Sequence, residues 1–256
     1  MMRKTILIYP VFLLITALFL SSCASKKEVM IQVYETSAAG HKLTPLEIFS
    51  KGEIVSEITI NPQEKRQVIT GFGGAFTESS ASVLNKLSSE KKDQIINAYF
   101  SEKGAAYSLT RTHMNSCDFS LSNYSYTEVE DDTQLEHFSI AHDKDDLIPM
   151  IKAAQAASKD GFKLFASPWT AAPWMKDNNS WVGGKLKPEY YQTWALFFSK
   201  YADAYKAQGI DIWGFTVENE PMGNGNNWES MVFSPQEMTH FVQNYLGPTL
   251  EANRQQ

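Results

Sequence analysis

The spacing of hydrophobic and polar residues changes twice along the chain. An almost unbroken apolar run covers residues 6–20. Residues 29–67 then alternate between apolar and polar, which predicts strands near 30–34, 46–49 and 54–60. From residue 67 onward, short apolar runs typical of buried strands take turns with longer segments of helical period. The chain therefore divides into a leader, a β-rich segment and an α/β segment.

The α/β segment predicts four strand–helix repeats. The helix at 188–207 is the clearest, because its aromatic residues fall three and four positions apart: Tyr191, Trp194, Phe198, Tyr201 and Tyr205. The last helix begins after Ser234, with Pro235 at its first position and Glu237 completing a capping box. The predicted strands are 67–71, 106–114, 163–167 and 212–217, and the other helices are 79–100 and 147–158.

Repeated strand–helix units indicate a parallel α/β fold, either an open doubly wound sheet or a (β/α)8 barrel. Gly71, Gly73 and Gly74 lack the spacing of a dinucleotide- or phosphate-binding loop. We interpret them as a tight turn that leaves the first strand.

The N-terminus predicts export. Arg3 and Lys4 precede the apolar run, and Cys23 follows small residues in a pattern that resembles a bacterial lipobox. A plain secretory signal is the alternative; the run is shorter than the roughly 20 residues of a membrane-spanning helix. We expect a signal peptide at 1–22, lipidation of Cys23 with membrane anchoring at the periplasmic or cell surface, a spacer with strands of a β-rich side domain at 23–66, and half of a catalytic barrel at 67–256.

Composition narrows the function further. The formal net charge is -6 and no basic cluster occurs, which argues against nucleic-acid binding. The chain has two cysteines, Cys23 and Cys117, so lipidation of Cys23 would leave no pair for an intrachain disulfide. The five histidines are scattered and none has metal-ligand spacing. We therefore expect no metal site.

The candidate chemistry lies where the predicted strands end. Asp118 follows the second strand, Trp169 follows the third, and Asn219 and Glu220 follow the fourth. In a barrel these positions share one rim, where catalytic residues lie. Carboxylates and amides bind hydroxyl groups, and an indole stacks on the apolar face of a sugar ring. The pattern therefore indicates a carbohydrate site.

Glycosidic cleavage requires two carboxyl groups, one of which must keep its proton to assist the leaving oxygen. Glu220, at the end of a buried strand, is the candidate acid. Glu218 lies two residues earlier and faces the same side, so we expect it to be a buried structural residue. Arg111 is its candidate partner; alternatively, Arg111 holds the catalytic carboxylates.

Three further residues have competing interpretations. Cys117 has no histidine in a recognised catalytic signature, which argues against a cysteine nucleophile. His113 lines the pocket or packs in the core, with packing favoured, and the role of Trp174 is open. The acidic run at 128–132 is interpreted as a solvated loop.

Four motifs in order resemble glycoside hydrolase family 30, the glucosylceramidase-like enzymes. They are GFGGAFTE at 71–78, TR at 110–111 with NSCDFS at 115–120, ASPWTAAPWMK at 166–176, and TVENEP at 216–221. Asn-Glu-Pro alone occurs in many barrel glycosidases, but four motifs at barrel spacing are specific. The resemblance runs from about residue 35 to the C-terminus.

The resemblance implies a retaining β-glycosidase on a (β/α)8 barrel beside a β-sandwich, without metal or organic cofactor. By this similarity Glu220 is the acid/base and Asn219 binds the sugar 2-hydroxyl. Asp118 and Trp169 bind the non-reducing sugar, and Arg111 joins them in the substrate site. Glucosylceramide is the main family substrate; β-1,6-glucan, β-xylosides and β-fucosides are alternatives.

The family's nucleophile is a second Glu at the end of strand seven. Residues 221–256 are too few for three further βα units, and Glu229, Glu237 and Glu251 fall in a loop or the final helix. We therefore expect the N-terminal portion of a longer enzyme, inactive and poorly soluble alone because half a barrel leaves open strand edges. The alternative is a non-catalytic carbohydrate-binding lipoprotein.

Overall fold

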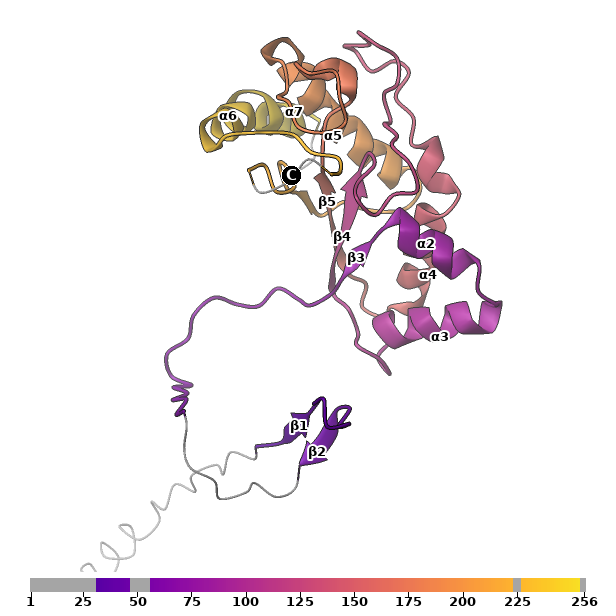
Figure 1. Cartoon of the computed structure of the whole chain (residues 1–256), viewed down its shortest axis with the longest axis vertical. Helices are drawn as coiled ribbons and strands as arrows, with labels where there is room; N and C mark the ends of the chain where they lie inside the picture. The colour runs from indigo at the N-terminus through magenta and orange to yellow at the C-terminus, as the bar shows by residue number, and fades with distance from the viewer. Residues whose placement is uncertain (1–30, 47–55, 223–226, 254–256) are drawn as a thin grey trace, which may run out of the picture. The chain divides into compact units, whose positions relative to one another are not determined.

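The structure, a computed structural model, describes residues 31–46, 56–222 and 227–253 (Figure 1). The chain forms two compact units, residues 1–66 and 67–256. Cys23 and the apolar leader lie outside the described residues, so export and lipidation stay predictions. Among the helices in the described ranges, none has the length and apolar character needed to cross a membrane.

The first unit contains one short hairpin. Strand β1 (Val33–Glu35) pairs antiparallel with β2 (Thr44–Leu46), with Tyr34 opposite Pro45. Residues 56–60 form no strand, so the described part of the predicted strand at 54–60 is wrong. Ile58 and Ile60 are exposed, so the alternation of apolar and polar residues in this segment does not bury an apolar face.

The second unit is built on a four-stranded parallel sheet in the order β3-β4-β5-β6. Its strands are β3 (Ala75–Phe76), β4 (Leu109–Met114), β5 (Lys163–Pro168) and β6 (Gly214–Phe215). Their order in the sheet follows their order in the chain, as in the successive strands of a barrel. The predicted parallel α/β class is confirmed.

The first strand starts later than predicted, after the glycines rather than before them. Residues 67–71 form no strand, and β3 begins at Ala75. The glycine segment runs alongside β4 instead: the Phe72 carbonyl accepts hydrogen bonds from the backbone N–H groups of Ser108 and Leu109. A Cβ on Gly73 would lie 1.8 Å from the Leu109 carbonyl oxygen. These glycines therefore permit close backbone approach, and the predicted tight turn is wrong.

Gly73→Ala is expected to destabilise the fold by about 1–3 kcal/mol, because the added methyl group meets a backbone carbonyl that cannot move aside alone. Gly74→Ala is the matched control, since its Cβ would lie 3.4 Å from a Tyr107 ring carbon, an ordinary contact. Its effect should stay within about 0.5 kcal/mol. The midpoint of urea unfolding measures the stability of both variants. Equal stability of the two variants would show that the glycine segment packs less closely against β4.

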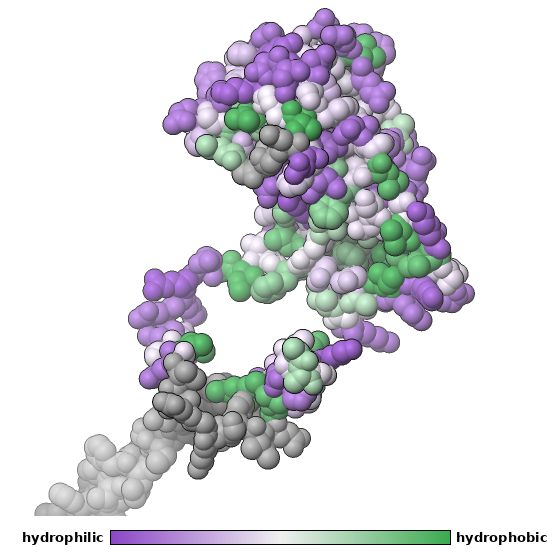
Figure 2. All heavy atoms as spheres, viewed as in Figure 1, coloured by the Kyte–Doolittle hydropathy of each residue, from purple (hydrophilic) through white to green (hydrophobic). Residues whose placement is uncertain are grey.

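The predicted helix at 79–100 is two helices, α2 (Glu78–Asn85) and α3 (Ser89–Phe100). Thr77 caps α2 by accepting a hydrogen bond from the Ser80 N–H. Both helices contact α4 (Leu147–Ala157), which also contacts β3. Figure 2 shows hydrophobic side chains at the surface near α2, where Val83 is exposed.

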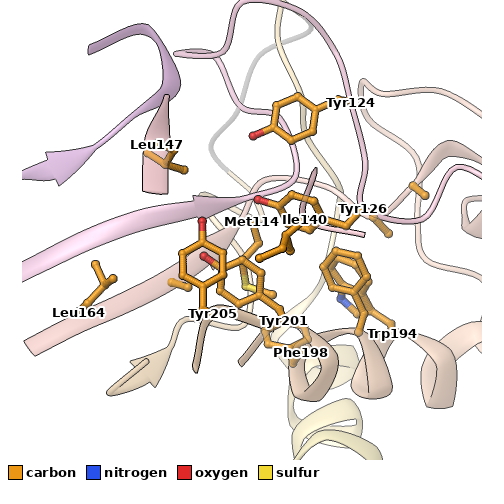
Figure 3. Close-up of a cluster of buried hydrophobic side chains, with 14 of the residues drawn as sticks. Met114, Tyr124, Tyr126, Ile140, Leu147, Leu164, Trp194, Phe198, Tyr201 and Tyr205 are labelled. Atoms are coloured by element: carbon orange, nitrogen blue, oxygen red, sulfur yellow. The ribbon is translucent and has the colours of Figure 1, made fainter. Parts of the chain in front are cut away.

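Helix α5 (Tyr191–Lys206) supplies much of the core. All five of its predicted aromatic residues are buried, and Trp194, Phe198, Tyr201 and Tyr205 have no exposed surface. Figure 3 shows these four side chains projecting from one face of the helix toward the strands. Each buried aromatic contributes roughly 2–3 kcal/mol of hydrophobic stabilisation. The short helices η1 (Ala141–Lys144), η2 (Pro173–Met175) and η3 (Pro188–Tyr190) lie in the connections.

The C-terminal helix is α6 (Pro235–Phe241), continued by η4 (Val242–Leu246) and α7 (Gly247–Ala252). The predicted capping box is confirmed: Ser234 Oγ accepts from the Glu237 N–H, and Glu237 Oε2 accepts from the Ser234 N–H. Helices η4 and α7 contact α5, so the last helices close over the aromatic core.

Candidate active site

Arg111, inside β4, lies at the centre of the candidate site. We name this group of residues the polar rim; its other members are Asp118, Trp169, Asn219 and Glu220. Its Nε donates to Ser167 Oγ at 2.8 Å, and one terminal nitrogen donates to Asn219 Oδ1 at 2.8 Å. The guanidinium lies over the Trp169 indole, 4.5 Å from the ring centroid. One cation therefore joins the ends of three neighbouring strands.

Asn219 is oriented by two contacts. Its backbone N–H donates to the Pro168 carbonyl, and its side-chain oxygen accepts from Arg111. With the oxygen engaged by a cation, the amide NH2 is the group left to donate to a ligand hydroxyl. The arrangement suits Asn219 for binding a sugar hydroxyl.

Glu220 is exposed and has an unusual backbone. Its φ is 45°, in the left-handed region that non-glycine residues rarely adopt. Such a conformation costs on the order of 1–3 kcal/mol and is often found at functional sites. The strained residue is the one predicted to be the proton donor.

Asp118 is exposed in the loop after β4, and Trp169 is half-buried after β5. Burial lowers the pKa of Arg111, and the negative charges of Glu220 and Asp118 oppose that shift. Both candidate carboxylates therefore lie close enough to interact electrostatically with the guanidinium. Of the other four predicted site residues, Asn219 and Trp169 contact Arg111 directly, and Asp118 and Glu220 lie within electrostatic reach of it.

Glu218 is buried, as expected, but its suggested partner is wrong. Neither carboxylate oxygen has a hydrogen-bond partner among the described residues, because Arg111 is directed to Ser167 and Asn219 instead. Burial raises the pKa of Glu218 well above its ordinary value, and the positive charge of Lys176 opposes this shift. Arg111 donates its hydrogen bonds to Ser167 and Asn219 and not to a carboxylate, so its alternative role of holding the catalytic carboxylates stays a prediction.

The sequence predicted no role for Lys176, yet its side chain is fully buried. Its ammonium donates to Thr170 Oγ1, to the Ser180 carbonyl and to the Ser230 carbonyl at 2.7–2.8 Å. Burial lowers the pKa of Lys176 to about 8, and the charge of Glu218 opposes the shift. The cation ties the loop after η2 to the segment that precedes α6.

The residues with open interpretations lie in the core. Both His113 ring nitrogens are engaged, by the Glu78 N–H and the Asn115 carbonyl. The Trp174 indole donates to the Thr127 carbonyl. Cys117 is buried, and burial raises the pKa of its thiol to about 12, which keeps it protonated and unsuited to nucleophilic attack. All three residues are structural in this arrangement.

The three later glutamates occupy different environments. Glu229 is buried and accepts a hydrogen bond from Asn123 Nδ2 at 2.7 Å. Glu237 is engaged by the capping box and by Lys185, which lower its pKa to about 2. Glu251 lies in α7. Throughout the described ranges, no group of three His, Cys, Asp or Glu side chains is placed to hold a metal ion.

The arrangement of the polar rim and the parallel sheet agrees with the comparison of the chain with known protein families. The model of the glycosyl hydrolase family 30 TIM-barrel domain matches residues 69–256. The chain belongs to this family. It is 38% identical to the lysosomal acid glucosylceramidase of Mus musculus and 30% identical to an endo-1,6-β-D-glucanase of Neurospora crassa. These matches cover 75% and 74% of the chain.

A solved family 30 relative has the same fold. An endo-β-1,6-glucanase of known structure superposes with a TM-score of 0.74 at 33% identity, over 86% of this chain and 49% of that one. The chain spans only 39% and 41% of the lengths of the mouse and Neurospora enzymes. The predicted (β/α)8-type domain is thus shown, and the activity of the whole protein is a matter for proposal.

Proposed function

We propose that this protein hydrolyses a β-glucosidic bond with retention of configuration, with Glu220 as acid/base. The observation that carries the proposal is the convergence of Asp118, Trp169, Asn219 and Glu220 around Arg111 at the ends of three neighbouring strands. This rim is where barrel enzymes place catalytic groups. The family membership supports a glycosidase specifically.

In the proposed mechanism, the Asn219 amide binds the hydroxyl next to the reacting carbon, and Trp169 and Asp118 hold the non-reducing sugar. Arg111 fixes the orientation of both Asn219 and Trp169, so it is a positioning group as well as part of the site. Glu220 donates its proton to the leaving oxygen, then removes a proton from the water that releases the sugar. A second carboxylate must act as nucleophile; we assign it to none of the described residues.

Glucosylceramide or a related β-glucoside is the proposed substrate, and β-1,6-glucan is the alternative. The names of the mouse and fungal relatives support these two in turn. Because this chain alone is expected to be inactive, a protein that carries the complete barrel should be assayed on an aryl β-glucoside, on glucosylceramide and on a β-1,6-glucan. We expect hydrolysis of the aryl glucoside and of one natural substrate, with the β-anomer appearing first by proton NMR. The α-anomer appearing first, or absence of hydrolysis, would contradict the proposal.

A further inference from the structure

A cavity adjoins the proposed site at Asp118. Its volume is about 480 Å³, within the range of roughly 300–1,000 Å³ typical of small-molecule pockets. It shares Asp118 with the polar rim, but Trp169, Asn219 and Glu220 do not line it. The cavity is therefore a neighbour of the proposed site rather than the same pocket.

The lining combines the groups that bind neutral sugars. Besides Asp118 it includes two indoles, an amide, a hydroxyl and a second carboxylate, from Trp181, Trp228, Asn123, Ser120 and Glu229. Indoles stack on sugar rings, while carboxylates and amides bind hydroxyl groups. Glu229 is 5% exposed and is held by Asn123, so one of the polar groups is oriented before any ligand arrives.

One side of the cavity is held by a set of contacts, which we name the loop zipper, between residues 180–184 and 228–232. The Ser230 N–H donates to the Trp181 carbonyl, the Gly183 N–H to Ser230 Oγ, and the Val232 N–H to the Gly184 carbonyl. The buried Lys176 ammonium joins the same two segments through the Ser180 and Ser230 carbonyls. These contacts therefore hold together the two segments that carry Trp181, Trp228 and Glu229.

The charge of the lining selects among ligands. Two carboxylates face the cavity, and its lining contains no lysine, arginine or histidine. The negative charge of the lining disfavours the binding of anionic sugars such as uronic acids. Two carboxylates are also too few for a metal centre, in agreement with the absence of a three-ligand cluster in the part of the chain that the structure describes. A neutral glycosyl unit fits the observed groups best.

We propose that this cavity is a second sugar subsite, which binds a neutral glycosyl unit attached to the sugar held by Asp118. The inference rests on the proposed function, because it places the cleaved sugar beside Asp118. Glu229 and Trp181 are its specificity-determining residues, one binding hydroxyl groups and the other stacking on the ring. The protein would accordingly prefer a chain-end disaccharide unit to a single glucose, which favours the glucan alternative over glucosylceramide.

The test compares an aryl β-glucoside with aryl β-glycosides of 1,3-, 1,4- and 1,6-linked glucose disaccharides. We expect kcat/KM for at least one disaccharide to exceed that for the glucoside about tenfold, which corresponds to about 1.4 kcal/mol of added transition-state binding. Glu229→Gln and Trp181→Ala should each reduce this ratio several-fold. The exposed residues Glu189 and Trp213 provide the matched controls Glu189→Gln and Trp213→Ala, which should leave the ratio unchanged.

A ratio near one for all three disaccharides in the unmodified protein would overturn the subsite. So would variants that slow the glucoside and the disaccharides equally. If the protein hydrolyses none of the four, the proposed function fails, and calorimetric titration with the free disaccharides decides the subsite separately. Tighter binding of a disaccharide than of glucose, lost in Glu229→Gln, supports it; equal binding overturns it.

Discussion

Glu220→Gln is expected to lower kcat/KM about 10²–10⁴-fold on glycosides with poor leaving groups, while an activated aryl glycoside retains its first chemical step. Glutamine preserves the shape of the side chain but has no proton to donate to the leaving oxygen. A dinitrophenolate departs with little assistance, so the release of the first product should remain fast. Stopped-flow measurement of the aryl burst, compared with steady-state hydrolysis of an alkyl glucoside, separates the two effects.

Glu218→Gln is the matched control, two residues earlier in the same segment. Glu218 is buried, whereas Glu220 is exposed at the polar rim, so the control should show no dependence on the leaving group. Any loss of activity at Glu218 should be equal on both substrates. An equal loss on both substrates for Glu220→Gln would count against its assignment as acid/base.

Asp143→Ala is expected to destabilise the protein by about 3–5 kcal/mol, the largest effect on stability that we anticipate. Asp143 is 2% exposed, and its carboxylate accepts hydrogen bonds from the hydroxyls of Tyr124, Tyr126 and Tyr205 at 2.6–3.2 Å. These tyrosines come from the loop after β4 and from α5, so one carboxylate joins two distant parts of the chain. Its removal leaves three buried hydroxyls without their acceptor.

Urea unfolding followed by circular dichroism measures this loss. Tyr205→Phe removes one of the three donors and should cost about 1–2 kcal/mol, so it reports on the network even if Asp143→Ala does not fold. Asp145→Ala, at an exposed position two residues away, should change stability by less than about 0.5 kcal/mol. A loss below about 1 kcal/mol for Asp143→Ala would show that the hydroxyls find other partners.

Local signals explain what the sequence predicted well. The capping box at Ser234 and the aromatic stripe of α5 depend on residues within a few positions of one another, and both are present in the structure. The candidate site was proposed from the sequence because Asp118, Trp169 and Glu220 each follow a strand of a parallel sheet within about five residues. This rule needs only the strand positions, which were correct for β4 and β5 within a few residues.

Contacts between distant segments explain the errors. The start of β3 depends on how closely Gly73 approaches Leu109, and no local pattern reports that distance. The expected pairing of Arg111 with Glu218 failed because the guanidinium is directed to Ser167 and Asn219. Lys176 lies in a loop without periodicity, and only the fold reveals that three oxygens surround its ammonium.

The loop zipper also determines how the cavity beside Asp118 can move. Its two segments lie about 50 residues apart in the chain but share backbone hydrogen bonds and the Lys176 ammonium. Such a pair forms one cooperative unit, since opening either segment breaks the contacts of both. This side of the cavity therefore cannot move through a hinge in one of the two segments alone. A ligand must fit the existing shape or supply the free energy to open the whole unit, so rigidity itself becomes a source of selectivity.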